Sequence, residues 1–132
     1  MKIAGIGDNV IDRYMNMGIM FPGGNAVNVA AHAALLGAEA AYVGSIGADR
    51  EGKILKNVNV IDGERHYIGC DLGTKWAHTT TIRTEDVEYL KTFDVIHTSC
   101  NAKLHEDVYK LKDLTGMVTF DFSVKDKYRT EE

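Results

Sequence analysis

The stretch from Ala26 to Leu36 constrains the fold most, because it is apolar at every position except Asn28 and His32. Its many alanines and leucines favour a helix. Asn25 stands just before it as a good N-cap, and Gly37 follows where a C-terminal cap belongs. The sequence therefore predicts a capped helix over this stretch.

The rest of the chain alternates β-type and helical segments. Strands are expected at Lys2–Gly7, Ala40–Ile46, Asp94–Ser99 and Met117–Phe122, and further helices from Lys53, at Thr84–Leu90 and at Glu106–Leu114. Gly18 and Pro22 interrupt Asp8–Pro22, which is expected to be loop or short strand. Asp62-Gly63 is a hairpin signal between residues 57–61 and 64–68. The pattern predicts an α/β protein with a largely parallel sheet, flanking helices and a small β excursion.

Composition narrows the classes of protein that the chain can represent. It has 132 residues, 45% of them hydrophobic and 26% charged, as in a single globular domain. A net charge of −4 leaves no basic footprint for nucleic acid. No apolar run is long enough to cross a membrane, and the five histidines lack metal-ligand spacing. Cys70 and Cys100 are isolated thiols, which favours a reducing, cytoplasmic setting.

The start of the predicted helix is the first candidate site. Asn25, Asn28 and His32 follow one another at i, i+3 and i+7, on one helix face. By spacing alone, Asn25 caps the helix and Asn28 satisfies a neighbouring backbone group. Alternatively, the free N–H groups of the helix meet a polar ligand, which Gly23 and Gly24 allow to approach the backbone closely. Two carboxamides offer donors and acceptors together and suit vicinal hydroxyls better than a phosphate.

The turn after the first strand allows two other interpretations. Gly5-Ile6-Gly7 begins like a dinucleotide-binding turn, but Val10 stands where the third glycine belongs. Asp8 would also place a negative charge at the pyrophosphate, which disfavours this interpretation. Asp12 lies just beyond the strand, where open α/β sheets bind ligands, and its carboxylate can accept hydroxyl hydrogen bonds. A solvated loop carboxylate is an equal alternative.

Four segments at matching spacing resemble the N-terminal signature of the PfkB (ribokinase-like) carbohydrate kinases. They are Asp12, then Gly23-Gly24-Asn25-Ala26-Val27-Asn28-Val29-Ala30, then Leu36-Gly37-Ala38, then the turn from Val43 to Gly52. Gly7-Asp8-Asn9 and the Phe120-to-Ser123 segment are most similar to the fructoselysine-type kinases of that family. The resemblance spans essentially the whole chain and thins between Asn57 and Thr84.

The resemblance implies ATP-dependent phosphorylation of a hydroxyl on a fructosamine-type or other ketose-like substrate. The positions that match the family's substrate-binding segments are Asp12, Gly23, Gly24, Asn25 and Asn28. The 57–68 hairpin would belong to a lid over the sugar, and such lids often join two subunits into a homodimer. A sugar- or nucleoside-binding module without catalytic activity is the alternative.

The same resemblance implies that part of the kinase lies elsewhere. The family's catalytic base stands in a late G-A-G-D motif that this sequence lacks, so the base is expected beyond Glu132 and this chain alone is expected to be inactive. ATP and Mg²⁺ would bind mostly outside the chain as well. Family members also carry a longer helix and another strand at Lys56-Asn57, so either residues are missing from the sequence there or the chain is a truncated relative. The chain is expected to be the N-terminal part of a PfkB kinase domain.

Several polar residues near predicted strand ends are candidates for lining the same pocket. They are Asp8, Arg65, Asn101 and Asp121, with His97, Ser99 and Ser123 at the same strand ends. The carboxyl ends of parallel strands are where ligands bind in such sheets. A structural role is the alternative for each strand-end residue, and a solvated position on the hairpin is the alternative for Arg65.

Overall fold

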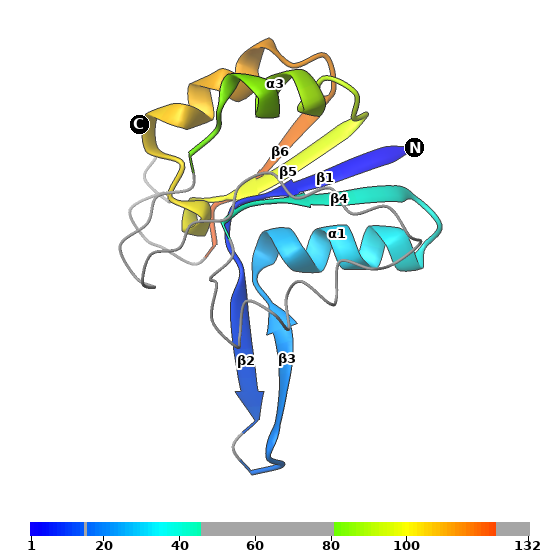
Figure 1. Ribbon diagram of the computed structural model, residues 1–132, viewed down its shortest axis with the longest axis vertical. Helices are drawn as coiled ribbons and strands as arrows, with labels where there is room; N and C mark the ends of the chain where they lie inside the picture. The colour runs from blue at the N-terminus through cyan, green and yellow to red at the C-terminus, as the bar shows by residue number, and fades with distance from the viewer. Residues whose placement is uncertain (15, 46–80, 124–132) are drawn as a thin grey trace.

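The computed structural model describes residues 1–14, 16–45 and 81–123 (Figure 1). The helices, 3-10 helices (η) and strands, in chain order, are β1 (Lys2–Ile6), β2 (Val10–Tyr14), β3 (Ile19–Gly23), α1 (Asn25–Leu35), β4 (Glu39–Val43), α3 (Thr84–Leu90), β5 (Val95–Ser99), η1 (Cys100–Ala102), η2 (His105–Asp113) and β6 (Met117–Asp121). The predicted helix at Lys53 and the 57–68 hairpin lie outside the described residues.

Four strands form a parallel sheet in the order β4-β1-β5-β6 within the described part of the chain. Figure 1 shows α1 on one side of this sheet and α3 on the other. Such a sheet is usually covered on both faces, which explains why its strands are rich in apolar residues. The predicted parallel α/β architecture with flanking helices is confirmed.

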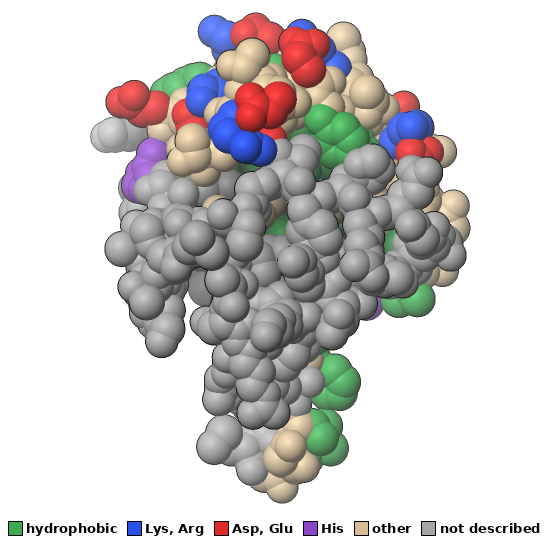
Figure 2. Space-filling model, viewed as in Figure 1, with side chains coloured by type: hydrophobic (Ala, Val, Ile, Leu, Met, Phe, Trp, Pro, Cys, Tyr) green, Lys and Arg blue, Asp and Glu red, His purple; other side chains and the backbone are tan. Residues whose placement is uncertain are grey.

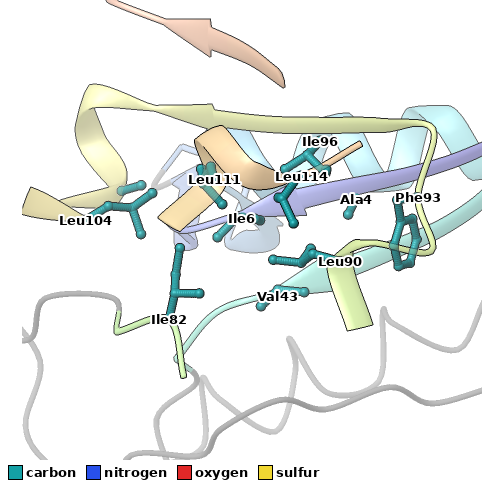
Figure 3. Packing of buried hydrophobic residues seen from close by; sticks show 11 residues of the cluster. Ala4, Ile6, Val43, Ile82, Leu90, Phe93, Ile96, Leu104, Leu111 and Leu114 are labelled. Atoms are coloured by element: carbon teal, nitrogen blue, oxygen red, sulfur yellow. The ribbon is translucent and has the colours of Figure 1, made fainter. Parts of the chain in front are cut away.

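The larger core lies between the sheet and the helices on the α3 side (Figure 3). Ile6 of β1 and Ile96 of β5 are fully buried there, and they pack with Leu90 of α3 and Leu111 of η2. Small residues dominate the second core under α1, which consists of Ala26, Val27, Ala30 and Tyr42. The alanine-rich helix therefore lies close to the sheet because its buried face has little side-chain bulk.

A two-stranded antiparallel ribbon interrupts the path from β1 to α1. Strands β2 and β3 pair from Val10 with Gly23 to Tyr14 with Ile19, and Figure 1 shows the ribbon extending away from the sheet. The sequence predicted loop or short strand here, and the strand alternative is the correct one. Gly18 lies at the turn with φ +64°, so the residue that interrupts the helical pattern is the one that permits the reversal.

Helix beginnings are where the expected and observed elements differ most. α1 begins at Asn25, and its N-cap is Gly24, so the prediction that Asn25 caps the helix is wrong. α3 has the predicted bounds, and Asp86 accepts the backbone N–H of Arg83 at 2.8 Å. The helix expected at Glu106–Leu114 is instead a 3-10 helix, η2. At α1 the difference comes from a tertiary hydrogen bond, because the backbone N–H of Asn25 donates to Asp8 and no side chain caps the helix locally.

Candidate functional site

The ends of three parallel strands and the beginning of α1 meet at one edge of the sheet. Asp8 follows β1, His97 lies in β5, and Asp121 is the last residue of β6. Asn25, the first residue of α1, contacts all three of these residues. This is the carboxyl edge, where ligands bind in open α/β sheets. We call Asp8, Asn25, His97, Ser99, Thr119 and Asp121 the carboxyl-edge cluster.

The Asp8 carboxylate ties α1 to the sheet. Oδ2 accepts the backbone N–H of Asn25 at 2.7 Å, and Oδ1 accepts the hydroxyl of Ser99 at 2.9 Å. A negative charge at a helix N-terminus is favoured by the helix dipole and by the free N–H groups. The sequence left the free N–H groups at the start of α1 open to a ligand. In the structure the Asp8 carboxylate already accepts one of them, the N–H of Asn25.

The side chain of Asn25 is held at both ends of its carboxamide. Its Nδ2 donates to Oδ2 of Asp121, and its Oδ1 contacts Nε2 of His97. The other ring nitrogen of His97, Nδ1, lies 2.8 Å from the hydroxyl of Thr119. Since Oδ1 is an acceptor, Nε2 carries the proton and Nδ1 of a neutral His97 accepts from Thr119. The network joins α1, β5 and β6.

Gly24 is required by the packing of the chain on itself. Its φ is +102°, and a Cβ there would lie 2.7 Å from both the Cα of Asn9 and the carbonyl oxygen of Asp8. The missing side chain therefore gives room to the turn after β1. The predicted role of Gly23 and Gly24 in approaching a ligand stays a prediction.

A buried tyrosine anchors that turn from the other side. Tyr42 of β4 donates to the carbonyl of Gly7 at 2.7 Å and accepts from Nδ2 of Asn9, which also donates to the carbonyl of Ser45 at 2.6 Å. Burial raises the pKa of Tyr42 far above its ordinary value, the hydrogen bond from Asn9 lowers it, and the nearby charge of Asp8 raises it. The phenol stays protonated and keeps its donor role.

The other sequence-predicted residues lie around this cluster. Asn28 is exposed on α1, where its backbone N–H bonds to Gly24. Asp12 is in the ribbon, paired with Phe21. Asn101 is exposed and joins the cluster through its backbone N–H, which donates to Oγ of Ser99 at 3.1 Å. Arg65 lies outside the described residues. The structure thus brings together Asp8, Asn25 and Asp121.

Thr119 is the member of the cluster that sequence reasoning missed. It pairs with His97 in the β5–β6 register and stands two residues before Asp121, so both side chains lie on one face of β6. Alternation along the predicted strand was therefore a signal that could have found it. In the ranges 1–14, 16–45 and 81–123, no group of three or more His, Cys, Asp or Glu could hold a metal ion. No helix in those ranges is long and apolar enough to cross a membrane.

Comparison with known proteins shows that this chain is similar to sugar and nucleoside kinases. The chain is 30% identical to fructosamine kinase FrlD of Bacillus subtilis (strain 168) over 148 residues, which cover 93% of this chain and 52% of that protein. The aligned length exceeds 132 residues, so the relative carries residues within the match that this chain lacks. No family model matches the sequence.

Solved structures show the same fold. Aminoimidazole riboside kinase from Salmonella enterica superposes with a TM-score of 0.68 at 20% identity, covering 96% of this chain and 52% of that one. Fructokinase with bound ATP from Xylella fastidiosa also superposes with a TM-score of 0.68. It is 18% identical, and the match covers 96% of this chain and 50% of that one. The ribokinase-like fold and the resemblance to PfkB carbohydrate kinases are thus confirmed. The chain spans about half the length of the relatives that it matches.

Proposed function

We propose that this chain is the sugar-binding part of an ATP-dependent PfkB-type carbohydrate kinase that phosphorylates a hydroxyl of a fructosamine-type or other ketose-like substrate. The observation that carries the proposal is the carboxyl-edge cluster, set at the beginning of α1 in a chain similar to a fructosamine kinase over most of its length. Ligands of open α/β sheets bind at this edge.

The groups around the cluster suit a polyhydroxylated ligand. Asn28 presents an exposed carboxamide one turn into α1, with a donor and an acceptor side by side. Asp12 belongs to strand β2 of the ribbon, where it pairs with Phe21, and we assign it to the same sugar site. Asn25 acts differently, because its carboxamide already bonds to His97 and Asp121. Its role is to hold the start of α1, and with it Gly23, Gly24 and Asn28, at a fixed place over the sheet.

The proposed chemistry depends on positioning. Bound ATP supplies the phosphoryl group, with Mg²⁺ to offset its charge. Residues of this chain bind the acceptor and orient its hydroxyl, which lowers the barrier by fixing the reacting groups in place. The sequence lacks the late G-A-G-D motif of the family, so we assign the ATP site, the Mg²⁺ site and the general base to the half of the kinase fold outside the match.

Substrate binding tests the proposal directly. The purified chain is titrated with fructoselysine, D-fructose and a nucleoside, and its melting temperature is followed. A saturable rise with fructoselysine, lost in Asn28→Ala and kept in His32→Ala, is the expected result. His32 is exposed on the same helix one turn further on, so it controls for loss of a polar helix residue. Equal binding by the Asn28 and His32 variants, or a response to the nucleoside alone, would contradict the proposal.

A sugar- or nucleoside-binding module without catalytic activity is the second candidate. The observation that favours it is Asn28, whose exposed carboxamide near the start of α1 can bind a hydroxyl whether or not phosphoryl transfer follows. Incubating the chain with fructoselysine, Mg²⁺ and ATP labelled at the γ-phosphate separates the two. Sugar binding without transfer, by the chain alone and also by the chain co-expressed with the other half of a relative, favours the module. Transfer in either case excludes it.

We also propose that the protein works in the cytoplasm and forms a homodimer through its lid, in which we include the ribbon of β2 and β3. The ribbon supports the second point, because Met17, Ile19 and Phe21 are all exposed on it. Figure 2 shows hydrophobic side chains on the part of the surface that extends away from the body. Light scattering at increasing concentration should give twice the mass of the chain, and Phe21→Lys should lower it. A monomer at all concentrations would exclude the dimer.

A further inference from the structure

Four side chains form a hydrogen-bonded path that begins and ends on strand β6. Thr119 and Asp121 stand two residues apart on β6, and the path between them runs through His97 of β5 and Asn25 of α1. All four residues are half-buried, and hydrogen bonds in such surroundings strengthen one another. We call these residues the four-residue network.

The charge of Asp121 fixes the direction of every hydrogen bond in the network. An ionised carboxylate only accepts, so Nδ2 of Asn25 faces it and Oδ1 faces His97. The imidazole must then carry its proton on Nε2, and Nδ1 accepts from Thr119. The opposite flip of the Asn25 amide would set its oxygen against the carboxylate. The carboxylate itself is held by the backbone N–H of Ser123, which donates to its other oxygen at 2.7 Å.

His97 is the rigid member of the network because its strand lies inside the sheet. It pairs with Gly5 of β1 on one side and with Thr119 of β6 on the other. The first turn of α1 lies directly on the same place, since a Cβ at Gly5 would be 2.1 Å from the carbonyl oxygen of Ala26. This close approach is what brings Asn25 within hydrogen-bond distance of the imidazole.

The beginning of α1 depends on such contacts from the sheet. Its N-cap, Gly24, has no side chain with which to cap the helix. Two residues of the carboxyl edge therefore hold it: Asp8 binds the backbone N–H of Asn25, and His97 binds its carboxamide. The backbone N–H of Asn28 then donates to the carbonyl of Gly24 at 2.9 Å. Asn28, to which we assign the sugar, is thus one helical turn from the residue that His97 holds.

We propose that His97 is a positioning residue of the sugar site. Its Nε2–H, directed by Thr119 and Asp121, holds the carboxamide of Asn25 and so keeps the start of α1 in the arrangement that binds the substrate. The effect on the sugar rests on the proposed function, whereas the effect on Asn25 does not. A role in the general stability of the sheet is the alternative that the experiments must separate.

The tautomer of His97 is the first test. Nuclear magnetic resonance of the isotope-labelled chain is recorded at about pH 8.5, where an unperturbed imidazole is neutral. The Nε2–H form alone is expected. Asp121→Asn removes the charge that orients the network, so the Nδ1–H form should become measurable in that variant. An Nδ1–H form in the natural chain, or an unchanged tautomer in Asp121→Asn, would overturn the proposal without any use of sugar.

Hydrogen exchange of the Asn28 amide is the second test. His97→Leu removes both ring nitrogens, and His97→Gln keeps an N–H donor. Ile96→Val is the matched control, because Ile96 is the neighbouring residue of β5 and is buried in the larger core on the other face. Relative to the amide of Ala4 in the central strand β1, the Asn28 amide should exchange about tenfold faster in His97→Leu. It should not do so in His97→Gln or Ile96→Val.

Fructoselysine binding to the same variants completes the experiment. Affinity should fall about tenfold in His97→Leu and should be largely restored in His97→Gln. Equal losses in His97→Leu and Ile96→Val would show that His97 only stabilises the sheet. If the natural chain binds no sugar while the tautomer and exchange results hold, the proposed function fails and the hold of His97 on α1 stands.

Thr119→Val serves if circular dichroism shows that His97→Leu is unfolded. It removes the hydroxyl that bonds to Nδ1 and nearly keeps the shape of the side chain, and Thr119→Ser keeps the hydroxyl. The Asn28 amide should exchange faster, and fructoselysine should bind more weakly, in Thr119→Val than in Thr119→Ser. Identical behaviour of these two variants would also overturn the proposal.

Discussion

The backbone at the beginning of α1 is packed against the turn after β1 with no room for a side chain. Gly24 combines φ of +102° with contact to Asn9 and Asp8, and this conformation is nearly restricted to glycine. The adjacent Asp8 carboxylate receives the first backbone donor of the helix. Gly24 and Asp8 both fix the position of α1. A substitution at either residue should therefore lower the stability of the protein and displace the proposed sugar site.

Gly24→Ala should destabilise the protein by about 1–3 kcal/mol from backbone strain, with the clash adding to this cost. Gly37→Ala is the matched control, because Gly37 also has a positive φ, of +85°, but a Cβ there would meet nothing within 4 Å. It should cost about 1–2 kcal/mol. Urea denaturation of both variants shows whether Gly24→Ala loses more unfolding free energy than Gly37→Ala. Equal midpoints would show that the turn can move away from Gly24.

Asp8→Asn should lower the free energy of unfolding by about 1–3 kcal/mol, the range for losing hydrogen bonds to a charged acceptor. The amide nitrogen of the variant would face either the N–H of Asn25 or the hydroxyl of Ser99, both of which donate to Asp8. Asp94→Asn is the control, since Asp94 accepts the backbone N–H of Lys2 at an exposed position. A larger loss in the control would contradict the assigned role of Asp8.

Helix η2 is tied to the segment before α3 by one carboxylate. Asp107 accepts from Nζ of Lys110 and from the backbone N–H of Ile82, each at 2.7 Å, and Lys110 also donates to the carbonyl of Ile82. Figure 2 shows charged side chains gathered on the part of the surface above the grey region, where Figure 1 places α3. Ile82 is buried in the larger core, so this bond set fixes where the chain enters α3.

The pH dependence of stability should reveal this contact. The hydrogen bond from Lys110 is the main cause that lowers the pKa of Asp107, while partial burial raises it and the Ile82 N–H lowers it further. A lowered pKa in the folded state stabilises the protein above the unfolded-state pKa of about 4 and is lost as pH falls through the lower value. Asp107→Asn should therefore be less stable than the natural chain near neutral pH, and the difference should shrink below about pH 4.

Asp113→Asn is the control for this titration, because Asp113 is exposed at the end of the same 3-10 helix. Urea midpoints of the natural chain and both variants, measured from neutral pH to about pH 3, give the comparison. A constant difference between the natural chain and Asp107→Asn across this range would show that the charge of Asp107 does not carry the effect.

Patterns along the chain predicted most elements, including α1, α3 and the four parallel strands. The ribbon of β2 and β3 was harder to predict because two short strands around Gly18 carry little periodicity, and such a ribbon is marginal without contacts elsewhere. The 3-10 geometry of η2 was not predictable either. Glu106 and the residues after it have ordinary helix-forming propensities, which do not separate a 3-10 helix from an α-helix.

At the level of the whole molecule, one core joins the sheet to two other segments, the end of α3 with the turn after it and η2. Leu90 of α3, Leu111 of η2 and Phe93 meet Ile6 and Ile96 of the central strands (Figure 3). The core on the α1 side is smaller and contains Ala26, Val27, Ala30 and Tyr42. The α3 side should therefore carry the larger share of the stability that holds the carboxyl edge together.

Leu90→Ala should cost about 2–5 kcal/mol, as for other buried leucines. Stabilities of single domains are about 5–15 kcal/mol, so this loss should be a large part of the total and should also weaken ligand binding through partial unfolding. Leu35→Ala is the control, because Leu35 is 72% exposed at the end of α1. Similar unfolding free energies for the two variants would contradict the core described here.

The sequence by itself determined the elements and the candidate edge. The apolar helix from residue 26, the glycines that flank it and the short β-type runs depend on local propensity and periodicity, which neighbouring residues carry. The same patterns named Asp8, Asn25 and Asp121. They could not state which of these residues meet, because the partners are far apart along the chain.

Only the tertiary structure decided those pairings. Asp8 and Ser99 are 91 residues apart, and Asn25 and Asp121 are 96 apart. They meet because the strand order β4-β1-β5-β6 places β5 between β1 and β6. A register shift of one residue would turn Thr119 and Asp121 to the other face. The sequence marked the start of α1 as a candidate ligand site. In the structure its polar groups already bond to Asp8, His97 and Asp121, and strand order and register decide which residues these are.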